Sequence, residues 1–138
     1  PAFLAHPAST QAAFAENSAV TVVFGTERFD QGSNFASNAF TAPVTGKYHL
    51  DTQVQLQDIE TAYDNYQIAL ITSNKTYYAT IDPDGFDLNA VYLPLSLSIL
   101  VDMDISDTAH VTVIASNTGG GAGHDILADS FFSGYLVC

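Results

Sequence analysis

The sequence has no tryptophan and little of what builds a helical or a disulfide-linked protein. Its 138 residues include one cysteine, one methionine and three basic residues. The good helix formers Glu, Lys, Arg and Met occur only three, two, one and one times, which argues against a helical fold. The single cysteine, Cys138, excludes an intrachain disulfide, so the fold must rest on its hydrophobic core. Because no apolar run approaches the ~18 residues of a membrane-spanning helix, we expect no membrane insertion.

The shortage of basic residues makes the chain strongly acidic. Fifteen acidic residues against three basic ones give a formal net charge of −12 at pH 7. Such a surface repels phosphate backbones and anionic lipid headgroups, so we expect no nucleic-acid partner. The same surface would tolerate cations, including divalent ones. The alternative is that the charge serves only solubility.

Apolar residues in alternation with polar ones are abundant. The chain is 47% hydrophobic, with nine Phe and seven Tyr, a composition typical of strands. From residue 47 to 57 the odd positions are polar and the even positions are apolar or Thr. This period of two predicts a half-buried antiparallel strand. Comparable segments predict further strands at 20–24, 66–72, 76–81, 91–101, 111–115 and 131–137.

Turn-forming residues separate these segments. We expect loops rich in Gly, Pro, Asn and Asp at 30–34, 45–46, 82–85, 102–107 and 117–123. Many short strands at this spacing predict an all-β sandwich, jelly roll or barrel. The chain shows no linker and no internal repeat, so we expect one domain over residues 1–138.

Several residues of the sequence follow the pattern of a known family. The order Phe-x5-Asp-x4-Phe-x4-Phe-x5-Gly-x-Tyr is formed by Phe24, Asp30, Phe35, Phe40, Gly46 and Tyr48. It resembles the signature of the complement component 1q globular head, whose fold is shared with the tumour necrosis factor superfamily. The ending with Phe132, Gly134 and Tyr135 is similar to that family's closing strand. The resemblance reaches from the opening strand at residues 1–5 to the closing strand.

The resemblance implies a fold and a mode of assembly. It implies an antiparallel jelly-roll sandwich of two sheets that forms a homotrimer, as the C-terminal head of a longer chain. The spacing between Phe35 and Phe40 is two residues shorter than in the family, so we expect a tighter hairpin there. The acidic composition and the segment 24–30 look like the versions in marine bacterial and phage structural proteins.

Three signature positions have a direct physical reading. Gly46 suits a positive φ or a close backbone approach before the strand. Tyr48 would bury its ring and needs a partner for its hydroxyl. Gly134 suits a bulge or a backbone packed closely against a neighbour. The signature residues are therefore expected in core and turn roles.

The sequence offers no catalytic constellation, and we expect no enzyme. The histidines His6, His49, His110 and His124 have no metal-ligand spacing. Ser130 and Ser133 lack the strand-turn-helix context of a nucleophile elbow. The glycine-rich stretch 119–123 is followed by no Lys-Ser or Lys-Thr, so it predicts an inter-strand loop rather than a phosphate site.

Two acidic loops could hold a cation. We expect no required cofactor, but calcium takes six to eight oxygen ligands in flexible geometry, which makes it the candidate ion. The first loop carries Asp102, Asp104 and Asp107, and the alternative loop carries Asp82, Asp84 and Asp87. Neither has EF-hand spacing, and Asp is common in turns, so a structural role is the alternative.

We carry three functional hypotheses. The first is a trimeric head, extracellular or on a virion surface, that binds a protein or glycan ligand on a cell, as a phage-fibre tip or a secreted or cell-surface protein. The second is a structural trimerisation or capsid-decoration module without its own ligand. The third is a glycan-cleaving enzyme, which would need two carboxylates facing each other ~5–10 Å apart. Three copies would carry a formal charge of 3 × −12 = −36, so assembly should strengthen with salt or calcium.

Overall fold

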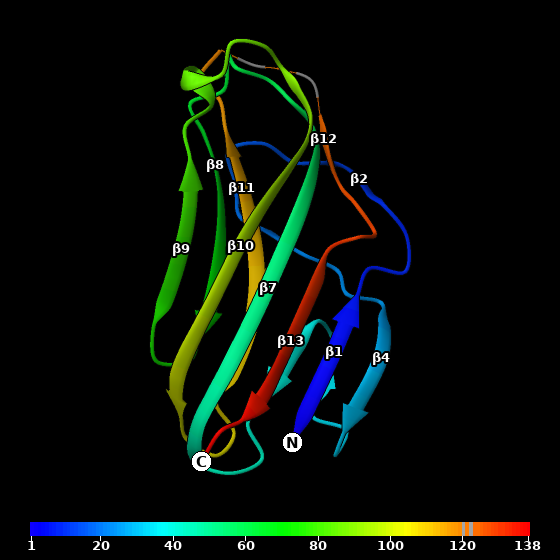
Figure 1. Ribbon diagram of the computed structural model, residues 1–138, viewed down its shortest axis with the longest axis vertical. Helices are drawn as coiled ribbons and strands as arrows, with labels where there is room; N and C mark the ends of the chain where they lie inside the picture. The colour runs from blue at the N-terminus through cyan, green and yellow to red at the C-terminus, as the bar shows by residue number, and fades with distance from the viewer. Residues whose placement is uncertain (120, 122) are drawn as a thin grey trace.

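The computed structural model describes residues 1–119, 121 and 123–138. Two antiparallel sheets pack face to face, with their long strands along the long axis of the molecule (Figure 1). This confirms the expected all-β jelly-roll sandwich. Both ends of the chain lie at one end of the sandwich, called the base, and the opposite end is called the apex (Figure 1).

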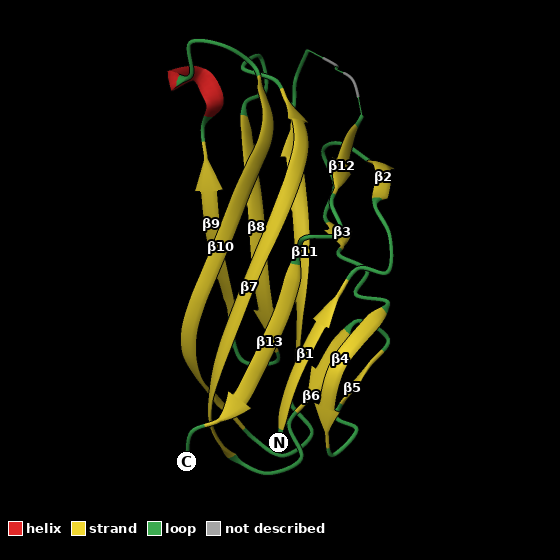
Figure 2. Ribbon diagram, turned by 45° about the vertical axis from the view of Figure 1, so that its right-hand side comes forward, coloured by secondary structure: helices red, strands yellow, loops and turns green. Residues whose placement is uncertain are grey.

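Sheet A has seven strands: β1 (Ala2–His6), β2 (Gln11–Phe14), β4 (Thr26–Gln31), β7 (Gly46–Ile59), β10 (Ala90–Met103), β12 (His124–Ile126) and β13 (Phe131–Leu136). Sheet B has six: β3 (Val20–Thr21), β5 (Phe35–Ala36), β6 (Ala39–Thr41), β8 (Asn65–Thr72), β9 (Thr76–Ile81) and β11 (Thr108–Ser116). One 3-10 turn, η1 (Pro83–Gly85), lies at the apex (Figure 2). Among the described residues, no helix has the length and apolar character to cross a membrane.

Strand β7 is the centre of sheet A. It pairs along its whole length with β10, from Ile59 opposite Ala90 to Gly46 opposite Met103. On its other side it pairs with β13 and then β12. The sheet continues from β13 to β1 and β4. Because β10 pairs only with β7, it forms one edge of the sheet.

Sheet B begins with a two-residue hairpin. Phe35 stands opposite Phe40, and Ala36 opposite Ala39. The two turn residues, Ser37 and Asn38, have φ of 51° and 67°, and two positive φ angles define the type I′ turn that suits such a short loop. The expected tight hairpin between Phe35 and Phe40 is therefore present.

The strand expected at 20–24 is much shorter than predicted, since only Val20 and Thr21 pair with β11. The Val22 backbone N–H still donates to the Val111 carbonyl oxygen of β11 at 3.0 Å. Beyond it, the Val23 and Phe24 N–H groups donate to side-chain oxygens, of Gln11 at 3.0 Å and of Asn38 at 2.9 Å. Val22 and Phe24 nevertheless stay buried. The predicted strand is therefore present only at Val20–Thr21, because side chains replace the backbone partners at the end of the segment although its alternating residues stay buried.

The core is built on a cluster of phenylalanines between the two sheets. Phe3 stacks on Phe35 and Phe40, with ring centroids 5.0 and 4.8 Å away, and meets Phe132 edge-on at 5.0 Å. All four rings are nearly inaccessible to solvent. Buried aromatic pairs of this kind add to the stability gained from apolar area, so β1, β13 and the β5–β6 hairpin are joined through one cluster.

Gly134 lets β13 lie close to this cluster. A Cβ atom at Gly134 would stand 2.5 Å from the Leu50 side chain, 2.8 Å from the Phe3 ring and 3.1 Å from the His49 carbonyl oxygen. The register of β13 with β1 and β7 shows no shift at this residue. Close packing rather than a bulge accounts for the glycine.

We predict that Gly134→Ala lowers the free energy of unfolding by about 1–3 kcal/mol, because an added methyl group overpacks the core. Urea denaturation would measure the change. Gly85→Ala is the matched control, since a Cβ there would meet no atom within 4 Å. Equal stability of the Gly134 variant and the control would contradict this reading of β13.

Candidate functional site

Most of the signature residues are engaged in the core or in turns. The Asp30 carboxylate accepts hydrogen bonds from the backbone N–H groups of Asn34 and Phe35, both at 3.0 Å, and so holds the turn after β4. The Tyr48 hydroxyl donates to the Val44 carbonyl oxygen at 2.6 Å. A Cβ at Gly46 would stand 2.6 Å from the Cys138 carbonyl oxygen. These residues position the strands rather than form a site.

The first acidic loop is organised by Asp107. One of its carboxylate oxygens accepts from the Asp104 backbone N–H at 2.8 Å and from the Asn74 side-chain amide at 2.9 Å. Asp102 offers its carbonyl oxygen to the same amide at 3.1 Å. In the alternative loop, Asp82 accepts from the Asp84 backbone N–H at 3.0 Å and caps η1, and Asp87 is exposed.

Across residues 1–119, 121 and 123–138, no three or more His, Cys, Asp or Glu side chains are grouped so that they could hold a metal ion. Within one chain, the described contacts of Asp107 stabilise a turn. Calcium binding by either acidic loop stays a prediction.

We predict that Asp107→Ala lowers the free energy of unfolding by about 1–2 kcal/mol, because two donors lose their acceptor. The exposed Asp87 of the other loop provides the control, and Asp87→Ala should change stability by less than about 0.5 kcal/mol. Thermal or urea denaturation of both variants measures the difference. If the two variants were equally stable, Asp107 would have no structural role.

The apex contains a buried histidine. His124 is 1% exposed, and its Nε2 lies 3.1 Å from the Tyr66 hydroxyl. The rings of Phe14, Tyr63 and Tyr66 surround it, and Tyr63 meets it edge-on at 4.5 Å. Burial raises the pKa of Tyr66 to about 12, and burial followed by a hydrogen bond with Glu16 raises the pKa of Tyr63. Both phenols therefore stay neutral, as structural residues do.

Of the expected loop at 117–123, residues 120 and 122 lie outside the described residues.

Two cavities of the described chain are both small. One of about 240 Å³ lies beside residues 58–60 and 89–91, and another of about 240 Å³ lies beside residues 8–11, Val23 and Gly25. Sites for small molecules usually measure ~300–1,000 Å³. A binding surface is therefore a better candidate than a pocket.

The outer face of sheet A is the best candidate surface. Along β7 the side chains at even positions from Tyr48 to Leu56 point into the core, so the odd positions point outward. The strand register places Ala2, Tyr135, His49 and Leu100 in one row across this face. Leu4, Ser133, Asp51 and Ser98 form the next row, and Phe29 stands beside Leu4. The large, partly apolar side chains Phe29, Tyr92, Leu100 and Tyr135 on this face are 52%, 57%, 53% and 50% exposed.

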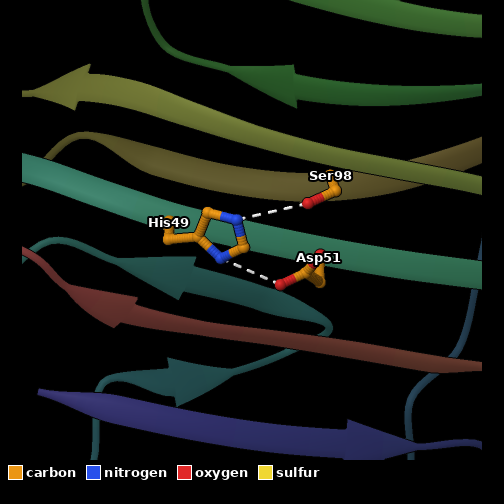
Figure 3. A network of polar contacts seen from close by, with 3 residues as sticks. All are labelled: His49, Asp51 and Ser98. Atoms are coloured by element: carbon orange, nitrogen blue, oxygen red, sulfur yellow. Dashed lines mark hydrogen bonds and ion pairs between the residues drawn. The ribbon is translucent and has the colours of Figure 1, made fainter.

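A polar network lies at the centre of this face (Figure 3). His49 Nε2 is 3.2 Å from the Ser98 hydroxyl across the β7–β10 pair. His49 Nδ1 is 2.9 Å from Asp51 Oδ2. This second contact is not aligned as a hydrogen bond, and Nδ1 is buried without a hydrogen-bond partner. We therefore treat it as a close contact that becomes an ion pair only when His49 is protonated.

The network has the order of a Ser-His-Asp triad but not its surroundings. Such a triad needs donors aimed at a developing oxyanion. The backbone of β7 is paired on both sides, with β10 and with β13, so its amides lie in the sheet plane rather than at the Ser98 hydroxyl. Sequence reasoning missed this network because His49 and Ser98 are 49 residues apart and only the strand register brings them together.

Comparisons with known proteins agree with this architecture. The family model described as C1q domain matches residues 2–137. No curated protein matches the sequence. Among solved structures, the globular domain of zebrafish complement 1qA protein is 18% identical, with a TM-score of 0.70 over 100% of this chain and 98% of that one. Murine APRIL is 12% identical, with a TM-score of 0.69 over 99% and 98%. Eiger TNF from S. frugiperda is 12% identical, with a TM-score of 0.69 over 99% and 92%.

Proposed function

This chain belongs to the C1q domain family, and on that premise we propose that it is a non-enzymatic head domain that assembles as a homotrimer and binds a protein or glycan ligand on a cell surface. It would act outside the cell or on a virion, as a fibre tip or as part of a secreted or cell-surface protein. The observation that carries the proposal is the outer face of sheet A, where Phe29, Leu100 and Tyr135 are each about half exposed. We infer that copies of the chain meet there.

The apolar residues of this face are spread across the sheet, from β10 to β4. Tyr135 and Leu100 flank His49 on the β13 and β10 sides. Phe29 and Leu4 stand opposite each other at the β1–β4 pair, further across the sheet. Aromatic and aliphatic side chains form the buried part of most protein interfaces. Contact between copies would remove these side chains from water.

The charge distribution also favours this face. The charged residues of β7, β10 and β13 that are not buried are Lys47, Asp51, Asp58 and Asp102, and Lys47 stands opposite Asp102. This area therefore carries a small part of the net charge of −12. Because like charges repel when brought together, a sparsely charged face is the one that copies can bring into contact.

Tyr135→Glu tests the proposed face. Introducing a carboxylate where copies meet should shift the protein to monomers, because the charge would be buried without a partner. Tyr78→Glu is the matched control, since Tyr78 is 59% exposed on β9 of sheet B. Sedimentation velocity reports the mass of each. If the Tyr135 variant stayed trimeric, or the Tyr78 variant alone dissociated, another surface would form the assembly.

Ionic strength should affect the assembly in a predictable direction. Three copies carry a formal charge of 3 × −12 = −36, and salt screens such repulsion over ~10 Å at 0.1 M. We predict a larger trimer fraction at high salt, and with calcium relative to chelator if the acidic loops bind it. Sedimentation under these conditions measures both effects. A trimer fraction that did not change with salt would show that repulsion does not limit assembly.

A further inference from the structure

We propose that His49, held between Asp51 and Ser98, makes self-association of this chain stronger as the pH falls. The inference rests on the proposed function, because it assigns a regulatory role to the face through which copies are proposed to meet. Histidine ordinarily changes charge between about pH 5 and pH 8. The responsive range is therefore mildly acidic to neutral.

The position of His49 supports this role. It lies on the central strand β7, in the row between Tyr135 and Leu100. Its side chain is 31% exposed, and that of Asp51 is 35% exposed. Both groups are therefore partly solvated in the single chain and would lose that water when another copy covers the face.

The charge at this point depends on the imidazole. When His49 is neutral, the Asp51 carboxylate has no cation beside it, and closing the face would desolvate an uncompensated charge in each copy. When His49 is protonated, the imidazolium lies beside the carboxylate, with Nδ1 2.9 Å from Asp51 Oδ2, and the two charges cancel. The Ser98 hydroxyl, 3.2 Å from Nε2, can then accept the hydrogen bond instead of donating it.

The groups around His49 do not reverse this effect. On β10, Leu100 stands directly opposite and Asp102 stands opposite Lys47. On β13, the Tyr135 ring lies 5.4 Å from the imidazole, centroid to centroid, where an aromatic ring favours a cation. On β1 and β4, the same row continues with Ala2 and Gln31, which carry no charge. His6, the other histidine of this face, has its Nδ1 2.9 Å from the Pro7 carbonyl oxygen.

The direction of the effect follows from linkage. The assembled state binds the His49 proton more tightly than the single chain does, because in the assembly water no longer stabilises the Asp51 carboxylate. Lowering the pH therefore shifts the equilibrium toward assembly. Each copy can raise the association constant at most by the ratio of its proton affinities in the assembled and single states.

Sedimentation at pH 8.0 and pH 5.5, at constant ionic strength, tests the proposal. The wild type should assemble at about tenfold lower concentration at the acidic pH. His49→Gln should lose most of this difference. His110→Gln is the matched control because His110 lies on the outer face of sheet B, and it should behave as the wild type. Asp51→Asn removes the charge to be compensated and leaves a protonated His49 without a counter-charge, so its assembly should not strengthen at the acidic pH.

The outcomes separate this inference from the proposed function. A wild type that is monomeric at both pH values contradicts both. Assembly of the wild type with the same affinity at both pH values overturns the inference alone, as does full pH dependence in His49→Gln or in Asp51→Asn. Circular dichroism of each variant establishes that it is folded, and because the two variants change different side chains, misfolding of one leaves the other decisive.

Discussion

The alternation of side chains along β7 is the constraint on which the rest of the molecule depends. Tyr48, Leu50, Val54 and Leu56 have no exposed surface, and Thr52 is 1% exposed. The residues between them face outward and are polar. A register shift of one residue would move His49 and Asp51 into the core and Leu50 into water. Because β10, β13 and β12 all pair with β7, this one pattern determines which side of sheet A packs against sheet B.

The core follows from the same alternation on the flanking strands. Phe132 comes from β13, which pairs with β7, and Phe3 comes from β1, the next strand of the sheet. Phe35 and Phe40 come from the hairpin of sheet B. Their rings meet in one cluster. Gly134 allows the strands to approach because a larger residue would collide with Phe3 and Leu50. Packing density in the core thus limits what β13 can contain.

The sequence predicted those strands that are marked by alternation and by turn residues among neighbouring positions. The segment 76–81 matches β9, and 47–57 lies within β7, because alternation and turn residues are properties of neighbouring residues. The strand predicted at 20–24 is shorter than expected because the backbone N–H of Phe24 donates to the side chain of Asn38, which lies in a distant turn. The His49–Ser98 contact could not be predicted from the sequence for a related reason, because strand register across a long connection is set by the whole sandwich.

The composition of the sheet A face gives the proposed assembly its specificity. Half-exposed apolar residues provide area to bury, while Asp51, Ser98 and the glutamines of β7 must find partners when water is removed. A wrongly registered contact would leave those polar groups unpaired, which is costly. Apolar area and a polar centre therefore act together, the first for affinity and the second for the choice of partner.

Hydroxyl-radical footprinting at protein concentrations below and above the assembly threshold tests the central claim, that copies meet through the outer face of sheet A, most directly. Tyr135 and Tyr78 provide the internal comparison, since they are 50% and 59% exposed on opposite sheets. The account predicts that oxidation of Tyr135 falls on assembly while oxidation of Tyr78 stays unchanged. Protection of Tyr78 with undiminished oxidation of Tyr135 would contradict it.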